Sequence, residues 1–459
     1  MLVKGAKRLP LFVVLLIFIS FTTLSFYCRD SLISPLIKPI WSRTGFAFPK
    51  NRHFDQHATS LELGTNEIEP DGHDISKTHV EVFSVSTKDK RYFLIEFGDE
   101  EAINPSIIPH SVHEDTWIIV AQQGRNLVAS SVWYAELVCD ARFVQGKLAC
   151  ISPPKILPIA VTSSDKCVDD LSYFSLNIGP HDARVFYGPH SPYVVYGSNS
   201  GYTCFGQWIQ DFRVLVDWSS ETIAGNEYRV ASELQRPPPI GAVEKNWFVF
   251  WDKEGDPYIH YDVAPRRVLA KLGFDGSVGQ DLAPWAAPSD EQCMQMFMPK
   301  VADQLESIHQ ATNSLSITLC KRSDLGCEPN DSNTYLMTIF QHKSFYSFHS
   351  VYEPYVMLFK RTPPFKIHAI SSKPIWIHGR AKAGEAMRPG GPEFEALRVW
   401  NQSEMVYVTS ISWKTHGQKY HGYIDDVMFI NFGIEDSKTA SIDVLAEDLV
   451  TNMGLCSSS

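Results

Sequence analysis

Basic runs are missing from this sequence after its first few residues, and negative charge is in excess. The 41 Lys and Arg are outnumbered by 52 Asp and Glu, which gives a formal net charge of -11. A protein that binds the phosphate backbone of a nucleic acid needs a positively charged face. The sequence therefore predicts that nucleic acids are not partners of this protein.

Cysteine spacings typical of zinc sites are missing too. The 9 cysteines include no CxxC pair and no His–Cys cluster, which disfavours a metal site. Apart from Cys28 their number is even, so an oxidising compartment would allow disulfides, although sequence alone does not fix the pairing. Cys320 and Cys327, in CKRSDLGC, are the best local pair. Two glycosylation sequons, at Asn330 and Asn401, fit the same compartment.

Long apolar runs without charge are confined to residues 9–27. As a helix this run would span about 28 Å, close to the hydrocarbon thickness of a membrane. Lys4, Lys7 and Arg8 precede it, which favours a cytosolic N-terminus. A cleaved signal peptide is the alternative, but no clean small-x-small cleavage site follows. We therefore expect residues 1–29 to be a tail and signal anchor, and the protein to be single-pass type II in the Golgi or endoplasmic reticulum membrane.

Helical periodicity is scarce in the rest of the chain. Residues 30–90 are polar and irregular, as in a lumenal stem or in an extended strand that wraps the domain. Residues 91–459 contain many short runs rich in Val, Ile, Tyr, Phe and Trp between turn residues, which indicates an all-β domain. The strands expected are RYFLIEF, TWIIVAQQ, SSVWYAELV, SPYVVYGS, FRVLVDW, WFVFW, YIHYDV, SLSITLC, TYLMTIF, PYVMLFK, MVYVTSISW and VMFINFGI. Helices are expected only within 289–310 and 444–453.

A weak internal repeat places a polar cluster ahead of an apolar strand, a turn and a second strand. Five such units over about 370 residues match the size of a five-bladed β-propeller. In that fold the innermost strands converge on one axis, so polar residues that begin them would line a central funnel. The five clusters begin at Asn104, Gly179, Glu244, His349 and His421.

Four of these segments resemble a known family. EKNWFVFWDKEGDPYIHYDVAPRRV is similar to the Lys-Asn motif, hairpin and proline segment of five-bladed propellers in the β-mannoside phosphorylase family, and GPHDARVF to its Gly-x-Glu-Asp-Pro-Arg motif. INFGIEDSKTASIDVLAEDLV resembles its closing segment. HQATNSLSITL, followed by FHSVYEPYVMLFKRTPPFKIHAISSKPI, resembles the fourth blade of related propellers. The resemblance covers about 104–450 and implies the fold more than the reaction.

The sequence also departs from that family. His181 replaces the Glu of the Glu-Asp-Pro-Arg motif, and the apolar run and stem are unlike soluble bacterial phosphorylases. The layout resembles fungal membrane-anchored glycosyltransferases, notably β-1,2-mannosyltransferases. Such an enzyme would displace an α-linked nucleotide diphosphate with inversion and form a β-linked mannoside.

That chemistry requires a carboxylate to take the acceptor proton, cations to stabilise the leaving phosphate and aromatic rings to hold sugars. Each candidate also has a structural explanation, such as a salt bridge, a strand cap or a buried histidine bonded to backbone. The candidate catalytic residues are Asp182, Glu244 and Asp436. The candidate substrate-binding residues are Arg184, Lys245, Asn246, His309, Asn313, His349, Asp425 and Asp426.

Asp425 and Asp426 raise the question of a cofactor. An Asp-Asp pair can bind a divalent cation that accompanies a nucleotide diphosphate, but a solvated turn explains the same motif. We therefore predict no metal ligands, and keep a divalent cation as an alternative.

The sequence predicts an inverting glycosyltransferase of the secretory pathway that moves mannose from a sugar nucleotide to a glycan acceptor in β-linkage. One alternative is a glycoside hydrolase or phosphorylase acting on β-mannosides; a hydrolase of the inverting type needs two carboxylates about 6.5–9.5 Å apart. The other is a non-catalytic carbohydrate-binding propeller, which the loss of the motif Glu keeps open.

Overall fold

A computed structural model describes residues 75–124, 126–128, 131–218, 227–310, 312–346, 349–386 and 400–456. The predicted signal anchor lies outside these residues, as does most of the predicted stem. Within the described ranges, no helix is both long and apolar enough to cross a membrane.

The described chain is mostly β, as the short apolar runs predicted, and its antiparallel strands form five sheets. Sheet 1 contains β3 (Ala102–Pro109), β4 (Trp117–Gln123), β7 (Glu136–Val144) and β8 (Lys147–Cys150), with β9 (Lys155–Ile156) paired to β7. Sheet 2 contains β11 (His181–Tyr187), β12 (Pro192–Asn199), β13 (Phe205–Asp211) and β14 (Ser232–Glu233). Sheet 3 contains β15 (Phe248–Trp251), β16 (Pro257–Asp262) and β17 (Val268–Lys271).

Sheet 4 begins with β18 (Glu306–Gln310) and β19 (Leu315–Thr318), which both pair with β20 (Thr334–Tyr346), and continues with β21 (His349–Lys360) and β22 (Ile367–Ser371). Sheet 5 contains β24 (Val406–Trp413), β26 (Val427–Ile434) and β27 (Lys438–Leu445). The smaller strands are β1 (Val80–Val82), β5 (Asn126–Val128), β6 (Ser131–Trp133), β10 (Asn177–Ile178), β23 (Ile375–Ile377) and β25 (His421–Tyr423). The helices are α3 (Ile75–Thr78), α4 (Ala287–Phe297), α6 (Ala446–Val450) and the 3-10 segments Asp169–Leu176, Phe212–Val214 and Ala283–Trp285.

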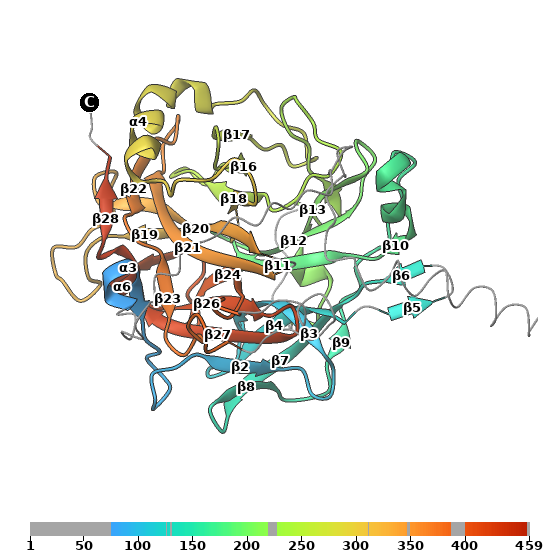
Figure 1. Cartoon of the computed structure of the whole chain (residues 1–459), viewed down its shortest axis with the longest axis horizontal. Coiled ribbons are helices and arrows are strands. Elements are labelled where there is room, and N and C mark those ends of the chain that lie inside the picture. Colours follow the sequence, from blue (N-terminus) through green and yellow to red (C-terminus); the bar gives the residue numbers. More distant parts are fainter. Residues whose placement is uncertain are drawn as a thin grey trace, which may run out of the picture. The chain divides into compact units, whose positions relative to one another are not determined.

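Hydrogen bonds join the first strand of each sheet to that of the next, in a closed ring. Asn104 bonds Asp182 between sheets 1 and 2, Arg184 bonds Asn246 between sheets 2 and 3, and Ser314 Oγ bonds Val249 O between sheets 3 and 4. Asn313 exchanges two bonds of 3.0 Å with the backbone of Ile411, and Thr409 and Ser410 both bond Pro105 O. The arrangement is propeller-like: β11 and β24 lie near the middle of Figure 1, and β8, β17 and β28 toward its edge.

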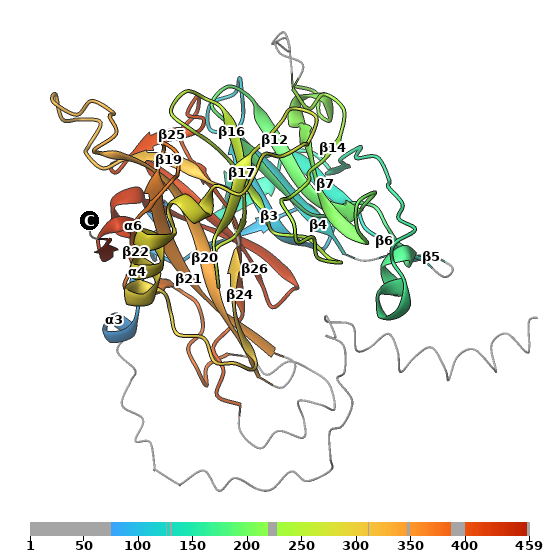
Figure 2. The same cartoon turned by 90° about the horizontal axis from the view of Figure 1, so that it is seen from above.

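The two ends of the described chain complete two of the sheets. Strand β2 (Phe93–Glu96) pairs with β27 through Phe93 and Leu94 and with β8 through Ile95 and Glu96, so it joins sheet 5 to sheet 1. Strand β28 (Met453–Leu455) forms the outer edge of sheet 4 beside β22. The disulfide Cys293–Cys456 links α4 to this edge, and Figure 2 shows α4 beside β22. Both ends are thus held by backbone pairing.

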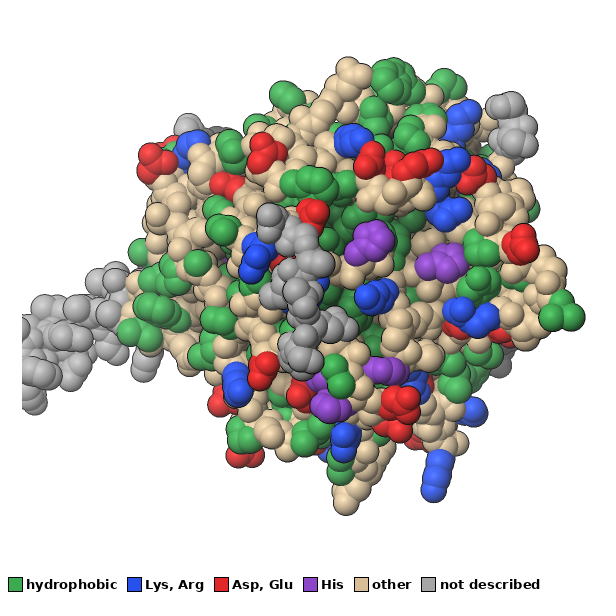
Figure 3. All heavy atoms as spheres, turned by 180° about the vertical axis from the view of Figure 1, so that it is seen from behind, with side chains coloured by type: hydrophobic (Ala, Val, Ile, Leu, Met, Phe, Trp, Pro, Cys, Tyr) green, Lys and Arg blue, Asp and Glu red, His purple; other side chains and the backbone are tan. Residues whose placement is uncertain are grey.

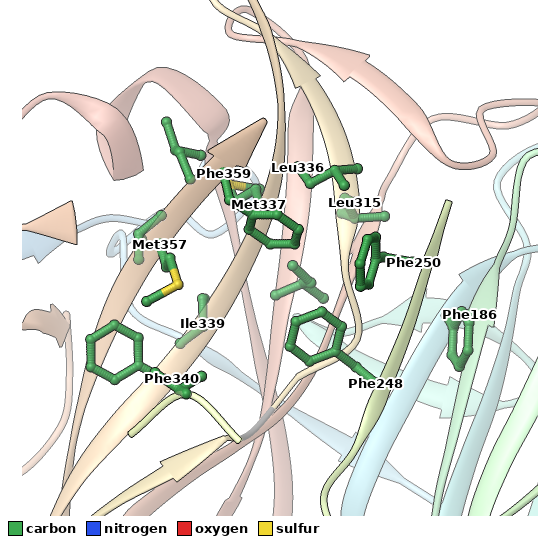
Figure 4. Close-up of a cluster of buried hydrophobic side chains, with 14 of the residues drawn as sticks. Phe186, Phe248, Phe250, Leu315, Leu336, Met337, Ile339, Phe340, Met357 and Phe359 are labelled. Atoms are coloured by element: carbon green, nitrogen blue, oxygen red, sulfur yellow. The ribbon is translucent and has the colours of Figure 1, made fainter. Parts of the chain in front are cut away.

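Apolar side chains fill the space between neighbouring sheets. Phe248 and Phe250 of β15 lie against β20 and β21, and all belong to one buried cluster. Figure 4 shows Phe340 and Phe359 in the same cluster. Because both faces of these sheets are covered, strands such as β12 are buried along their whole length instead of alternating between buried and exposed residues.

Several sequence predictions need correction. FRVLVDW, expected as a strand, forms the 3-10 segment Phe212–Val214 and a turn, because the Asp211 carboxylate caps it by accepting from Arg213 N at 3.0 Å. By contrast, α4 confirms the helix expected within 289–310; it ends at Phe297, and β18 follows. The clusters at His349 and His421 begin β21 and β25 and not the first strands of sheets 4 and 5.

The predicted boundary of the stem at residue 90 is also too late. Strand β1 pairs with β23 in register from Val80↔Ile375 to Val82↔Ile377. The wrapping strand, which was the alternative for this region, describes residues 80–82 better than a solvated stem does.

Disulfide bonds form as predicted. Cys320 and Cys327 are paired. The other three disulfides are Cys139–Cys150, Cys167–Cys204 and Cys293–Cys456.

Candidate functional site

Non-glycine residues in left-handed conformation mark the entries of three first strands. Asn104, Asp182 and Asn246 have φ of 56°, 52° and 65°, and Asp436, in the turn before β27, has φ of 45°. Asn and Asp tolerate this region best, yet it costs about 1–3 kcal/mol per residue. Such strain concentrates at functional sites because the surrounding structure has to impose it. These entries are therefore the first place to look for a site.

Hydrogen bonds from neighbouring sheets fix two of these strained residues. Asn104 Nδ2 donates to Asp182 Oδ1 at 2.6 Å, and Asp182 N donates to Gln122 Oε1 at 3.0 Å. Arg184 Nη2 donates to Asn246 Oδ1 at 2.5 Å. The Asp182 carboxylate is thus held from sheet 1, and Arg184 is oriented by sheet 3.

Cationic side chains surround this carboxylate. Burial lowers the pKa of Lys245, Lys343 and Arg184 lower it further, and Asp182 opposes the shift. Burial also lowers the pKa of Lys343, against the attraction of Asp436. The influence of Asp182 and Asp436 on these pKa values indicates that cations from sheets 2, 3 and 4 lie near the two carboxylates.

Aromatic rings complete the region. The Tyr352 and Tyr407 rings lie 4.8 Å apart between centroids, and Lys343 Nζ lies 5.5 Å from the centre of the Tyr352 ring. Burial raises the pKa of Tyr407 to about 12, with Arg184 opposing the shift, so its hydroxyl remains a donor at neutral pH. Burial lowers the pKa of His309 to about 4, so its ring is neutral there.

We call this group the inner-strand cluster. Six of its members were predicted from the sequence, namely Asp182, Arg184, Lys245, Asn246, His309 and Asp436. Lys343, Tyr352 and Tyr407 were missed. Lys343 and Tyr352 are paired directly across β20 and β21. This pairing depends on the register of the hairpin, so it could be found only from the structure.

A buried carboxyl lies behind the Asp182 strand entry. Glu136 Oε1 accepts from Ala183 N at 3.1 Å, and the residue is fully buried. Burial raises the pKa of Glu136 well above its usual range, and the charge of Asp182 adds to the shift while the Ala183 bond opposes it. Glu136 thus supports the backbone of the Asp182 strand entry from behind.

His181, which stands where the resembled motif has Glu, faces inward. Its ring stacks on Tyr134 with centroids 3.8 Å apart, and burial lowers its pKa to about 4. Gly179 permits this approach: its φ is 102°, and a Cβ there would lie 2.1 Å from Tyr134 O. His181 thus supports the Asp182 entry by packing and replaces no carboxylate function.

Glu244 lies outside the cluster although Lys245 follows it. Its Oε2 accepts from Arg236 at 2.9 Å, and its Oε1 accepts from Gly241 N at 2.6 Å. Arg236 also pairs with Asp262 at 2.7 Å. With both of its oxygens engaged, the buried Glu244 holds the loop before β15, and Asp182 is the better base.

Asn313 and His349 likewise form hydrogen bonds that support the fold. Asn313 joins sheets 4 and 5 through Ile411 and is buried. His349 Nε2 lies 3.2 Å from both carboxylate oxygens of Glu435. Because Glu435 precedes Asp436, His349 borders the cluster and supports the turn that carries Asp436.

Asp425 and Asp426 lie at the other end of the ring, away from the cluster. Asp425 accepts from Arg322 N at 2.7 Å, and Asp426 forms two bonds with the Arg322 guanidinium, at 3.1 and 2.6 Å. An arginine in this position competes with a cation, so the divalent-cation alternative does not fit these two residues. Among the described residues no group of three or more His, Cys, Asp or Glu has the geometry of a metal site.

Comparisons with known proteins return structures only. No family model matches the chain, and no curated protein does. A β-1,2-mannobiose phosphorylase from Listeria innocua aligns with a TM-score of 0.42 at 9% identity over 81% of this chain and 96% of that chain. A mannose phosphorylase from Leishmania mexicana aligns at 0.37 and 10% over 80% and 92%.

A GDP-mannose-dependent mannosyltransferase from Leishmania mexicana aligns at 0.37 and 9% identity over 77% of this chain and 89% of that chain. At these scores and identities the likeness carries no argument about activity. The activity has to be inferred from the residues of this chain.

Proposed function

We propose that this chain is a carbohydrate-active enzyme built on a five-bladed β-propeller, and specifically an inverting glycosyltransferase that forms β-mannosyl linkages. The observation that carries the proposal is the inner-strand cluster. It places a carboxylate held by Asn104 among cations from three sheets and beside two tyrosines. Those are the three kinds of group that sugar transfer from a phosphate leaving group needs.

Asp182 is the proposed general base. It takes the proton of the acceptor hydroxyl as that oxygen bonds to C1 of the donor sugar and the bond from C1 to the phosphate oxygen breaks. The electron pair of the broken bond leaves with the nucleotide diphosphate. Attack from the side opposite the leaving group turns an α-linked donor into a β-linked product.

Arg184, Lys245 and Lys343 are the proposed partners of the leaving phosphates. Cations that stand ready in a dry site stabilise the charge that develops on a leaving group. The Tyr352 and Tyr407 rings would hold the sugars, and Asp436 would bind hydroxyls beside Lys343. Asn246 keeps Arg184 in place.

The proposal includes the cellular setting. Four disulfides support an oxidising compartment, and residues 9–27 would hold the enzyme in the Golgi or endoplasmic reticulum membrane with its propeller in the lumen. The partners would be a sugar-nucleotide donor and a glycan acceptor, as in fungal membrane-anchored β-1,2-mannosyltransferases.

A screen of donors tests the proposal. The full chain would be incubated with labelled GDP-mannose and other sugar nucleotides, with manno-oligosaccharides as acceptors, and transfer measured by chromatography. We expect transfer of mannose, and loss of transfer in Lys245→Gln. No transfer from any donor, together with hydrolysis of a β-mannoside, would overturn the transferase.

One observation favours a second candidate, a β-mannoside phosphorylase. The cations of the cluster suit inorganic phosphate as well as a nucleotide, and a single carboxylate is sufficient to protonate the leaving sugar. Release of mannose 1-phosphate from a β-1,2-mannobiose substrate in phosphate buffer, without activity on sugar nucleotides, would identify it.

A further inference from the structure

A hollow of about 710 Å³ lies at the opposite ends of the strands that carry the inner-strand cluster. It is lined by the turns that follow β11, β15 and β24, whereas the cluster lies at the beginnings of these strands. Strand β11 runs from His181 to Tyr187, and at about 3.3 Å per residue such a strand separates the two regions by roughly 20 Å. We call this region the far hollow.

Cationic and imidazole groups dominate the polar lining of the far hollow. They are Lys253, Arg322, Arg361, Lys419, His190, His416 and His421. Three acidic groups lie beside them, and each has a partner in the protein. Asp426 is bound by Arg322, and Asp252 Oδ1 accepts from Glu254 N at 3.0 Å and Asp256 N at 2.9 Å. The exposed Glu254 carboxylate lies 3.8 Å from Lys253 Nζ. The hollow therefore offers donors to a ligand rather than acceptors.

Two of these groups are incompletely matched by the protein: a guanidinium N–H donor of Arg361 and a ring nitrogen of His416. Arg361 Nε and His416 Nδ1 are buried and have no hydrogen-bond partner in the part of the chain that the structure describes. The ion pair of Arg361, from Nη2 to Asp331, is 3.7 Å long. A buried donor without a partner costs about 1–3 kcal/mol, and a ligand oxygen at this position would remove that cost.

The wall behind these donors is rigid. The Trp251 and Tyr420 rings meet edge to face with centroids 5.1 Å apart, and Tyr420 Oη lies 2.8 Å from Ser314 Oγ. His421 Nδ1 lies 3.0 Å from Ser316 Oγ. Burial and the neighbouring arginines lower the pKa of His421 to about 4, so it is a neutral hydrogen-bonding group at pH 7.

We propose that the far hollow is a second binding site, for a ligand that carries a tetrahedral oxyanion such as a phosphate or sulfate group. The planar guanidinium of Arg361 matches two oxygens of such a group, and Lys419 supplies a further charge. The ligand is a free anion or an anionic ester of a sugar, and the aromatic wall suits the sugar ring of the ester. The site is independent of the inner-strand cluster and of the activity proposed for it.

Isothermal titration of the full chain with inorganic phosphate, mannose 6-phosphate and mannose tests this site. We expect both phosphates to bind at this site, and mannose binding, which belongs to the inner-strand cluster, to be unaffected by Arg361→Gln. Arg361→Gln should weaken phosphate at this site at least tenfold. Lys245→Gln should leave binding there unchanged, because it alters only the inner-strand cluster. Arg91→Gln is the matched control, since Arg91 is exposed and donates to Gly379 O at the outer edge.

Lys419→Gln covers the case in which Arg361→Gln fails to fold. Lys419 is exposed and donates to His190 O at 3.3 Å, so its loss should leave the thermal melt unchanged and weaken phosphate at least threefold. Equal affinity for both phosphates identifies the free anion, and tighter mannose 6-phosphate identifies the ester. Unchanged phosphate binding in folded Arg361→Gln or Lys419→Gln, or a loss of mannose binding as large as that of phosphate in these variants, overturns the proposal.

Discussion

At the scale of single residues, Asp182 and Glu244 have different hydrogen-bond partners and therefore different roles. Both are carboxylates at the entry of a first strand. The Asp182 carboxylate accepts from one amide donor and lies among the cations of the inner-strand cluster, whereas both oxygens of Glu244 are hydrogen-bonded, to Arg236 and to Gly241 N. Substitution should therefore separate activity from stability.

Asp182→Asn should lower kcat by about 10²–10⁴-fold, the contribution typical of a general base. The variant keeps an oxygen that can accept from Asn104, so KM and the thermal melt should change little. Steady-state kinetics with the best donor from the screen, together with circular dichroism, check this. Full activity in Asp182→Asn would exclude this residue as the base.

Glu244→Ala should instead destabilise the fold by about 3 kcal/mol, because it leaves the buried Arg236 with Asp262 as its ion-pair partner. Denaturant unfolding measures the change, and Glu244→Gln, which keeps an acceptor for Arg236, should lose less. If Glu244→Ala lost activity without a change in the free energy of unfolding, Glu244 would be a catalytic residue and not a structural one.

Residue types and order alone named six members of the inner-strand cluster, because they occur where polar residues precede an apolar strand. They did not predict that Asp425 and Asp426 would bind Arg322, since the partner is about a hundred residues away. Lys343 and Tyr407 were missed for the same reason. Their inward direction follows from strand register, and a shift of one residue would turn each side chain to the other face.

At the scale of elements, most apolar runs became the strands that their composition predicted. FRVLVDW did not, because local capping by Asp211 outweighs its β propensity. The polar clusters at His349 and His421 led to a wrong prediction of two first strands. Polar residues precede the second strand of a hairpin as well as the first strand of a sheet, and the sequence does not distinguish the two. Sheet pairing by β2 and β28 could not be read from the sequence, because it depends on distant partners.

The disulfides should contribute to stability in proportion to the loops that they close. Cys293 and Cys456 are 163 residues apart, and Cys139 and Cys150 are 11 apart. Removing the first pair by double Cys→Ser substitution should cost about 2–5 kcal/mol, and removing the second should cost less, because the longer loop restricts the unfolded chain more. Thermal unfolding compares the two, and an equal or opposite order would contradict the role given to the Cys293–Cys456 bond.

Strand β2 should be needed for cooperative folding, because it is the only hydrogen-bonded strand between sheets 5 and 1 among the described elements. Leu94→Pro removes a backbone donor at this junction and should cost about 3 kcal/mol or more. Limited proteolysis should then cut the variant faster than wild type. Equal rates of proteolysis for the variant and wild type would show that β2 is not needed to hold sheets 5 and 1 together.

At the scale of the whole molecule, charge of both signs is interspersed on the face shown in Figure 3. Over its described residues, this face therefore carries no broad patch of one sign of charge.

Acid should weaken the fold. His181, His309 and His421 have pKa values lowered to about 4 from an ordinary value of 6.5, chiefly by burial. The unfolded chain then binds more protons between these values, so the stability they provide is complete above pH 6.5 and is lost as pH falls toward 4. Each group contributes on the order of 1–3 kcal/mol. Urea unfolding at pH 7 and pH 5 should show the loss, and His309→Asn should reduce it; no change with pH would contradict the burial of these rings.

The stereochemistry of the product tests the central claim most directly. Proton NMR of the reaction with GDP-mannose and a manno-oligosaccharide would record the anomeric signal of the newly formed linkage as it appears. The account predicts a β-anomeric signal from the α-linked donor in the wild-type protein, and its absence with Asp182→Asn. An α-anomeric product, or a β product formed equally well by Asp182→Asn, would contradict it.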